Sequence, residues 1–271
     1  MAYETILYET DDRVATITLN RPERMNAFSL ALRREFVDAV SAADNDPEVR
    51  VLVIAGAGGK AFSAGYDIKE TADARERSLD QWRAILDEEF QFSLAPWECS
   101  KPVIAMIEGH CLAGALELAQ MCDVRYASED STFGVVETRF SNGILTLAMP
   151  WIIGARCREL IYTGDVIGAA EGLRLGLVNR VFPKAALRAE TMRIAKRMSR
   201  VALAALQWNK RAINQSFEAM GFSSALRYGR EACIILDATE TPEYKAFNEI
   251  RTTEGLGPAL KHLRDRFLPY E

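Results

Sequence analysis

A run of small residues followed by a glutamate is the first feature of this sequence that could do chemistry. The apolar residues 102–107 form a short run, rich in β-branched side chains and closed by Gly109, which predicts a buried strand. Small residues around Gly114 then lead into helically spaced apolar residues, so we expect a tight turn and the start of a helix. The first N–H groups of a helix have no partner inside it, and they form a site for negative charge.

Glu117 adds a second chemical group to this helix start. It follows Gly114 by three residues and therefore lies on the same face, one turn deeper. A backbone N–H donor and a carboxylate that converge on one spot suit a reaction in which a carbonyl oxygen gains negative charge while a nearby proton moves.

Two other stretches contain residues that could complete such a site. Ala64 and Gly65 would let the backbone bend closely around a ligand, although an ordinary turn from a strand to a helix would have the same composition. Glu137 is a second carboxylate, twenty residues after Glu117. The sequence alone does not show that the two carboxylates meet, and a plain surface position is the alternative for Glu137.

Composition limits the classes of protein that need to be considered. The chain has 271 residues, a formal net charge of −5 and 49% hydrophobic residues. This is enough for one large domain, or for a domain with a helical appendage, and for a sizeable core. The acidic balance argues against a nucleic-acid partner. No apolar run approaches the roughly 20 residues of a membrane span, and the N-terminus lacks a signal pattern, so we expect a cytoplasmic protein without a membrane partner.

Cysteine and histidine usage argues against a disulfide framework and a zinc site. The five cysteines are scattered, none forms a Cys-x-x-Cys pair, and the chain has only two histidines. No metal-binding residues are therefore expected.

The first part of the chain alternates strands and helices. Residues 3–9 and 13–19 predict a hairpin, Ser29 can cap a helix that runs to Ala43, and residues 50–55 predict the next strand. This alternation predicts a mixed or parallel sheet with crossover connections. Residues 71–80 are polar and charged, and we expect a mobile surface segment there.

Beyond Arg156 the pattern is nearly all helical, apart from a strand at 176–182. Helices are expected at 184–199, 202–218, 223–238, 241–250 and 256–266. A mixed first part followed by an all-helical tail suggests a core with a lid or an oligomerisation region.

Three stretches, taken in order, resemble the crotonase (enoyl-CoA hydratase/isomerase) superfamily. They are Asn20-Arg21-Pro22 with Asn26-Ala27, then 61–67, then 107–123. The spacing from Glu117 through Phe133-Gly134 to Glu137 is similar to that of the hydratase branch, and the segments 162–165, 170–179 and 254–255 extend the resemblance over essentially the whole chain.

This resemblance implies an α/β fold with a crotonase-like spiral of stacked ββα turns. Residues 1–200 would form this core with the CoA-binding and catalytic residues, and 201–271 a helical C-terminal region for lid and trimerisation. The family implies homotrimers, often paired into hexamers. It also implies an acyl-CoA substrate that carries its own coenzyme A, so no separate cofactor is expected.

The resemblance also assigns roles to individual residues. The backbone N–H groups of Tyr66 and Gly114 would form the oxyanion hole. Four further residues, Arg24, Ala64, Asp67 and Ile68, fall where family members line the CoA channel. Of these, Ala64 and Ile68 would act mainly through backbone contacts to adenine.

The expected activity is that of an enoyl-CoA hydratase, which adds water across the 2,3 double bond through an oxyanion-stabilised enolate. By the family's chemistry, Glu117 would be the base and Glu137 would supply the α-proton. A Δ3-Δ2-enoyl-CoA isomerase, which needs only one carboxylate, and another crotonase-type enzyme such as an acyl-CoA hydrolase are the enzymatic alternatives. A non-catalytic acyl-CoA-binding or RNA-binding relative is the third, although the helix from Ser29 has two arginines and no lysine.

The sequence departs from the family pattern on one side of the pocket. After Glu137 it lacks the glycine-rich Pro-Gly-x-Gly-Gly pattern, and residues 144–153 form a dense apolar run that suits a buried helix or a pocket wall, interrupted by Pro150. Bulk here is expected to reshape the acyl pocket, so the length and shape of the acyl group are left open.

Overall fold

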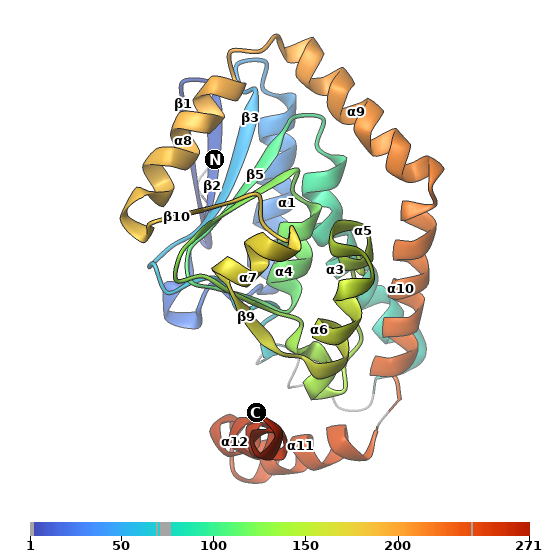
Figure 1. The fold of residues 1–271 in the computed structure, drawn as a ribbon. Helices are drawn as coiled ribbons and strands as arrows, with labels where there is room; N and C mark the ends of the chain where they lie inside the picture. Colours follow the sequence, from blue (N-terminus) through green and yellow to red (C-terminus); the bar gives the residue numbers. More distant parts are fainter. Residues whose placement is uncertain (1–2, 69, 71–76, 240) are drawn as a thin grey trace.

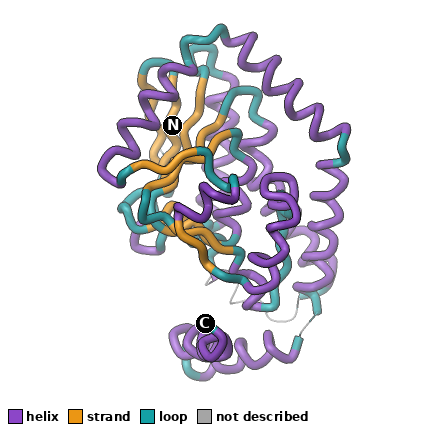
Figure 2. The backbone as a smooth tube through the Cα atoms, viewed as in Figure 1, coloured by secondary structure: helices purple, strands orange, loops and turns teal. Residues whose placement is uncertain are grey.

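Two β-sheets form the centre of the structure, with helices around them (Figure 1; Figure 2). This computed structural model describes residues 3–68, 70, 77–239 and 241–271. The strands are β1 (Ile6–Asp11), β2 (Val14–Leu19), β3 (Val51–Gly56), β4 (Ala61–Ser63), β5 (Val103–Ile107), β6 (His110–Leu112), β7 (Val124–Ser128), β8 (Thr132–Gly134), β9 (Val166–Gly168) and β10 (Arg180–Phe182).

The helices fill the segments between and after the strands. In chain order they are α1 (Leu30–Asn45), α3 (Leu79–Glu98), α4 (Gly114–Met121), α5 (Met149–Ile153), α6 (Cys157–Thr163), α7 (Ala169–Leu175), α8 (Leu187–Met198), α9 (Leu203–Ala219), α10 (Phe222–Asp237), α11 (Pro242–Thr253) and α12 (Leu256–Phe267). Short 3₁₀ turns include η1 (Pro22–Arg24) and η2 (Val136–Phe140). Among the residues that the structure describes, no helix is both long and apolar enough to cross a bilayer.

The larger sheet has the strand order β1-β2-β3-β5-β7-β10 and is parallel except for the β1–β2 hairpin. The smaller sheet has the order β4-β6-β8-β9 and is parallel except at β8–β9. Successive turns of the chain place one strand in each sheet and then a helix: β3-β4-α3, then β5-β6-α4. The stacked ββα turns that the family resemblance implied are confirmed.

The small sheet is where the sequence-based prediction of secondary structure was incomplete. A tight turn was predicted between the strand at 102–107 and the helix at Gly114, but β6 lies there and pairs with β4 and β8. Strands β8 and β9 were also missed. Each of these strands has only three residues, which is too short for an alternating pattern to stand out.

Both faces of the larger sheet are covered, which explains the continuous apolar runs of its strands. On β3, Leu52 and Ile54 pack with residues of α1 such as Phe36. Val53 on the opposite face packs with residues of α8, including Ile194. Because successive side chains of a strand point to opposite faces of the sheet, one run of apolar residues contributes to two separate cores.

The helices begin and end largely where local sequence signals predict, with exceptions at two prolines. Ser29 caps α1, as predicted, by accepting a hydrogen bond from Leu32 N at 3.2 Å. Pro150 does not interrupt the apolar run, because it lies in the first turn of α5, where a missing N–H costs nothing. Pro96 does not end α3, which continues past it to Glu98. Residues 71–76 of the expected surface segment lie outside the described residues.

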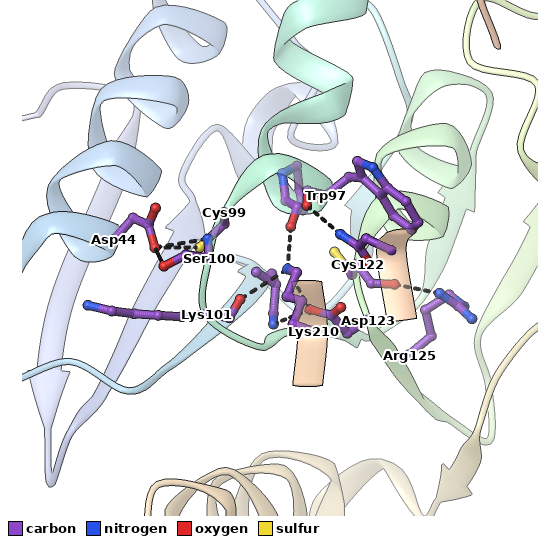
Figure 3. Close-up of polar contacts among 12 residues, drawn as sticks. Asp44, Trp97, Cys99, Ser100, Lys101, Cys122, Asp123, Arg125 and Lys210 are labelled. Atoms are coloured by element: carbon purple, nitrogen blue, oxygen red, sulfur yellow. Dashed lines mark hydrogen bonds and ion pairs between the residues drawn. The ribbon is translucent and has the colours of Figure 1, made fainter. Parts of the chain in front are cut away.

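The four C-terminal helices α9 to α12 agree with the predicted ones. Helices α9 and α10 run along one side of the molecule, and α11 and α12 lie beyond its lower end (Figure 1). Lys210 anchors α9, because its buried Nζ donates to Pro96 O (2.8 Å), Lys101 O (3.0 Å) and Asp123 Oδ2 (2.8 Å) (Figure 3). Asp123 also accepts from Val103 N at 2.7 Å, so the anchor sits between the end of α4 and the start of β5.

The residue before α4 is held in a costly backbone conformation. Ala113 has φ 54° and ψ −136°, a region that residues with a side chain rarely adopt. Such strain costs about 1–3 kcal/mol of folded-state stability. Replacing alanine by glycine relieves the strain, but it also lowers stability by about 0.4–1 kcal/mol, because glycine gives the unfolded chain more conformational freedom.

We therefore expect Ala113→Gly to raise the free energy of unfolding by about 1 kcal/mol. Urea unfolding of the two proteins measures this difference. Ala115→Gly, within α4, is the matched control and should lower the stability by about 1 kcal/mol. A loss of stability in Ala113→Gly would show that the backbone at this position is not strained.

Candidate active site

A cavity of about 240 Å³ brings together most of the residues singled out in the sequence. Its lining includes Ala64, Tyr66, Ile68, Glu117 and Glu137. A larger cleft of about 810 Å³ between α3, α9 and α10 contains none of the predicted site residues. The smaller cavity is therefore the candidate active site.

The Tyr66 segment and the start of α4 are in direct contact. Gly65 adopts φ +88°, and a Cβ at this residue would lie only 2.9 Å from Ala113 Cβ and 3.0 Å from Gly114 N. Only glycine allows this approach, because the conformation and the space both exclude a side chain. Hydrogen bonds on either side of Tyr66 fix its backbone: Phe28 N donates to Gly65 O (2.8 Å), and Asp67 N donates to Phe28 O (3.3 Å).

The ring of Tyr66 packs directly on Gly114. A Cβ at Gly114 would lie 2.4 Å from Cε2 of that ring, which no real contact allows. The Tyr66 hydroxyl is held within hydrogen-bonding distance of Ser93 Oγ (3.0 Å) and donates to Glu89 O (3.3 Å), so the ring cannot easily move away.

Gly114→Ala is therefore expected to separate the two backbone segments and to lower kcat about 10²- to 10³-fold, the usual effect of losing one oxyanion-hole donor. Steady-state kinetics with a 2-enoyl-CoA measures the loss. Gly168→Ala is the matched control, because a Cβ there has nothing within 4 Å and its backbone suits any residue. Equal activity of the two variants would contradict the assignment of Gly114 to the oxyanion hole.

Glu117 is buried and held by two backbone N–H groups. It lies in the first turn of α4, and its carboxylate accepts from Leu145 N (3.1 Å) and Thr146 N (2.7 Å). Burial raises the pKa of Glu117 to about 7, and these two hydrogen bonds limit the rise because they stabilise the charged form.

Glu137, in η2, lies next to Glu117 and has no comparable support. Its two carboxylate oxygens are buried, and outside the carboxylate pair neither has a hydrogen-bond partner among the described residues. Burial raises the pKa of Glu137 well above its usual range, and the charge of Glu117 raises it further. The two environments push the protonation states apart, so an ionised Glu117 beside a protonated Glu137 is the favoured arrangement.

The residues predicted to line a CoA channel are divided by the structure. Ala64 and Ile68 lie at the cavity, whereas Arg24 is exposed in η1, one residue before Met25, whose carbonyl accepts from Ala64 N (3.0 Å). Asp67 does not line the cavity. Its carboxylate, which is 10% exposed, forms an ion pair with Arg21 at 3.0 Å and so connects two neighbouring segments.

Several residues of the site were missed by sequence analysis. Leu145 and Thr146 act through backbone N–H groups, which leave no signal in residue type. Glu89 lines the cavity and forms a buried ion pair with Arg33 of α1, and Asp237 reaches the cavity from the last turn of α10. Burial raises the pKa of Glu89 to about 7 and that of Asp237 to about 6. Glu89 and Asp237 lie far from Glu117 in the sequence, so no local pattern connects them with it.

Comparisons with known proteins identify the family to which this fold belongs. The model of the enoyl-CoA hydratase/isomerase family matches residues 9–231. A probable enoyl-CoA hydratase of Rhizobium meliloti is 38% identical over 250 residues, which cover 89% of this chain and 92% of the relative. The crotonyl-CoA hydratase of Syntrophomonas wolfei is 36% identical over 224 residues, which cover 80% of this chain and 84% of the relative.

A solved structure gives the same result in three dimensions. The crystal structure of an enoyl-CoA hydratase/isomerase from Xanthobacter autotrophicus Py2 matches with a TM-score of 0.95 and 38% identity, covering 98% of this chain and 99% of that one. The chain therefore belongs to the enoyl-CoA hydratase/isomerase family, the crotonase superfamily that its motifs resemble.

Proposed function

We propose that this protein is an enoyl-CoA hydratase that adds water across the 2,3 double bond of an enoyl-CoA thioester. The observation that carries the proposal is the pair of buried carboxylates, Glu117 and Glu137, which face the same cavity. Their surroundings differ: backbone hydrogen bonds favour the ionised form of Glu117, whereas burial and the charge of Glu117 raise the pKa of Glu137 and favour its protonated form. Addition of water needs both states at once, since one proton must be taken from water and another given to carbon.

In the proposed mechanism, the thioester oxygen lies between the backbone N–H groups of Tyr66 and Gly114. These donors stabilise the negative charge that develops on the oxygen as water attacks C3. Ionised Glu117 takes a proton from the attacking water, and protonated Glu137 gives its proton to C2. Glu117 then holds a proton and Glu137 a charge, and a proton transfer between the two neighbours restores the starting pair.

The cavity has room for an acyl group with an apolar body. Aromatic and aliphatic side chains line it on the α3 side, namely Trp82, Ile85 and Leu86, and Leu145 lies beside the catalytic pair. The segment that departs from the family pattern thus contributes both a pocket wall and the N–H groups that hold Glu117.

A panel of 2-enoyl-CoA thioesters of different length and branching tests the proposed activity. We expect loss of the conjugated-thioester absorbance and formation of 3-hydroxyacyl-CoA for at least one member of the panel. A protein that instead moves the double bond of 3-enoyl-CoA substrates without adding water would be an isomerase. The absence of any reaction across the panel would overturn the proposal.

The pH dependence follows from the two raised pKa values. Glu117 must be ionised, so kcat/KM is expected to rise with pH through about 7, where burial places the pKa of this carboxyl. Glu137 must be protonated, so kcat/KM should fall again at higher pH, because its pKa is raised further by burial and by the charges of Glu117 and Asp237. The rise and the fall of kcat/KM report apparent pKa values of the coupled carboxylate pair as a whole. A profile that stays flat across pH 7 would contradict this assignment.

The C-terminal helices support a lid and an oligomer as part of the proposal. Tyr244 and Phe247 of α11 line the same cavity as the catalytic pair, as a lid would. Large apolar side chains are exposed along α9 and α10, among them Trp208 (65%) and Tyr228 (80%). Faces of this kind mark association surfaces, and we propose a homotrimer or a pair of trimers, which light scattering of the purified protein would test.

A further inference from the structure

The segment 141–148 is tied to three different carboxyl-bearing residues. Asn142 N donates to Glu137 O at 3.0 Å, which fixes the start of the segment to the residue that carries the proposed acid. Leu145 N and Thr146 N donate to the Glu117 carboxylate. Between these two attachments, Gly143 N donates to Asp237 Oδ1 at 3.3 Å.

Helix α10 is shaped to receive this segment. Its residues 229, 233 and 237 are spaced by four and therefore share one face. A Cβ at Gly143 would lie 2.6 Å from Cys233 Cα, and a Cβ at Gly229 would lie 3.1 Å from Leu147 Cβ. At Gly143 the backbone of the segment thus lies directly against the backbone of α10, with no space for a side chain, and at Gly229 the helix lies close against Leu147.

Asp237 is the polar end of this face. Apart from Gly143 N, its carboxylate has a weak contact from Cys233 Sγ at 3.8 Å. The N–H of Gly143 is the group that Asp237 holds, and Gly143 lies only two residues before the first N–H donor of Glu117. A shift of the segment at Gly143 is therefore transmitted to Leu145 and Thr146.

We propose that Asp237 is a positioning residue for the catalytic pair: by holding Gly143, it fixes the segment that connects Glu137 to Glu117. This inference rests on the proposed hydratase function, and it assigns to the C-terminal helix α10 a direct part in the geometry of the active site. The positioning role needs the acceptor atom of Asp237; the charge of Asp237 acts separately, by raising the pKa of Glu137.

Two substitutions separate the acceptor from the charge. Asp237→Ala removes the acceptor, and a displacement of the segment by an ångström is expected to lower kcat about 10- to 100-fold with little change in KM. Asp237→Asn keeps an oxygen that can accept from Gly143 N, so its kcat should stay closer to that of the wild type than to that of the alanine variant. Thr239→Ala, an exposed position just beyond α10, is the matched control.

Kinetics on the best enoyl-CoA substrate, together with thermal unfolding of each variant, decides the result. The proposal is supported if Asp237→Ala unfolds at or near the wild-type temperature, loses kcat and is rescued by asparagine. It is overturned if the alanine variant keeps wild-type kcat, if both variants lose kcat equally, or if only KM changes. Should the alanine variant fail to fold, the asparagine variant alone decides, since full loss of kcat there contradicts the acceptor role. Failure of the hydratase proposal would be seen separately, as an inactive wild-type protein.

Discussion

Glu117→Gln is expected to lower kcat for hydration by about 10²- to 10⁴-fold, the range in which a positioned general base contributes. The amide cannot take a proton from water at neutral pH. It also replaces one of the two acceptor oxygens by an NH₂ group, which cannot accept from both Leu145 N and Thr146 N. The proposed oxyanion donors of Tyr66 and Gly114 are untouched, so binding of the thioester should remain.

Parallel measurements of turnover and of binding test this expectation. Calorimetric titration with a saturated acyl-CoA, which cannot react, should give similar affinities for the variant and the wild type. Glu129→Gln, at an exposed position, controls for the loss of one carboxylate and should leave both quantities unchanged. A Glu117→Gln variant with near wild-type turnover on every 2-enoyl-CoA would show that another group is the base.

Glu137→Gln is expected to cut hydration to a similar degree, because the amide has no proton to give to C2. The fold should not suffer. Burial raises the pKa of Glu137 above the ordinary 4.5, so as the pH rises past 4.5 the unfolded chain releases this proton first and folded-state stability declines. The neutral amide removes this dependence, and at alkaline pH the variant should be at least as stable as the wild type.

The same variant distinguishes a hydratase from an isomerase. An isomerase needs one carboxylate to carry a proton between two carbons, so it would keep its activity on 3-enoyl-CoA after loss of Glu137 and lose it after loss of Glu117. Assays of both variants on 2-enoyl and 3-enoyl thioesters, with unfolding followed at alkaline pH, separate these outcomes. Retained hydration by Glu137→Gln would remove this residue from the mechanism.

The regular elements of the fold were largely predictable because their signals are local. The helix that Ser29 caps and the four C-terminal helices needed only periodicity and cap residues. The three-residue strands β6, β8 and β9 carry no such period, and only their pairing in the small sheet defines them. The stacked ββα order came from the resemblance of whole motifs to a family.

The site residues were likewise predictable where the sequence signal is local, and otherwise only through the family resemblance or not at all. Gly114 and Glu117 are three residues apart, so helix geometry alone placed them together. Tyr66 and Glu137 were connected to them through the family resemblance. The structure places Tyr66, Glu117 and Glu137 at one cavity and Gly114 directly against the Tyr66 ring. Asp237 could not be found from sequence, because its contact with the site depends on how α10 packs against the segment 141–148.

Product analysis in water labelled with heavy oxygen shows whether this protein adds water to C3 of an enoyl-CoA. We expect a 3-hydroxyacyl-CoA that carries the label in its hydroxyl group, with no label in the thioester carbonyl and no free coenzyme A. A free acid carrying the label in its carboxyl group would indicate a hydrolase, and an unlabelled isomer of the substrate would indicate an isomerase. Either product in place of the labelled hydroxyacyl thioester would show that the protein is not a hydratase.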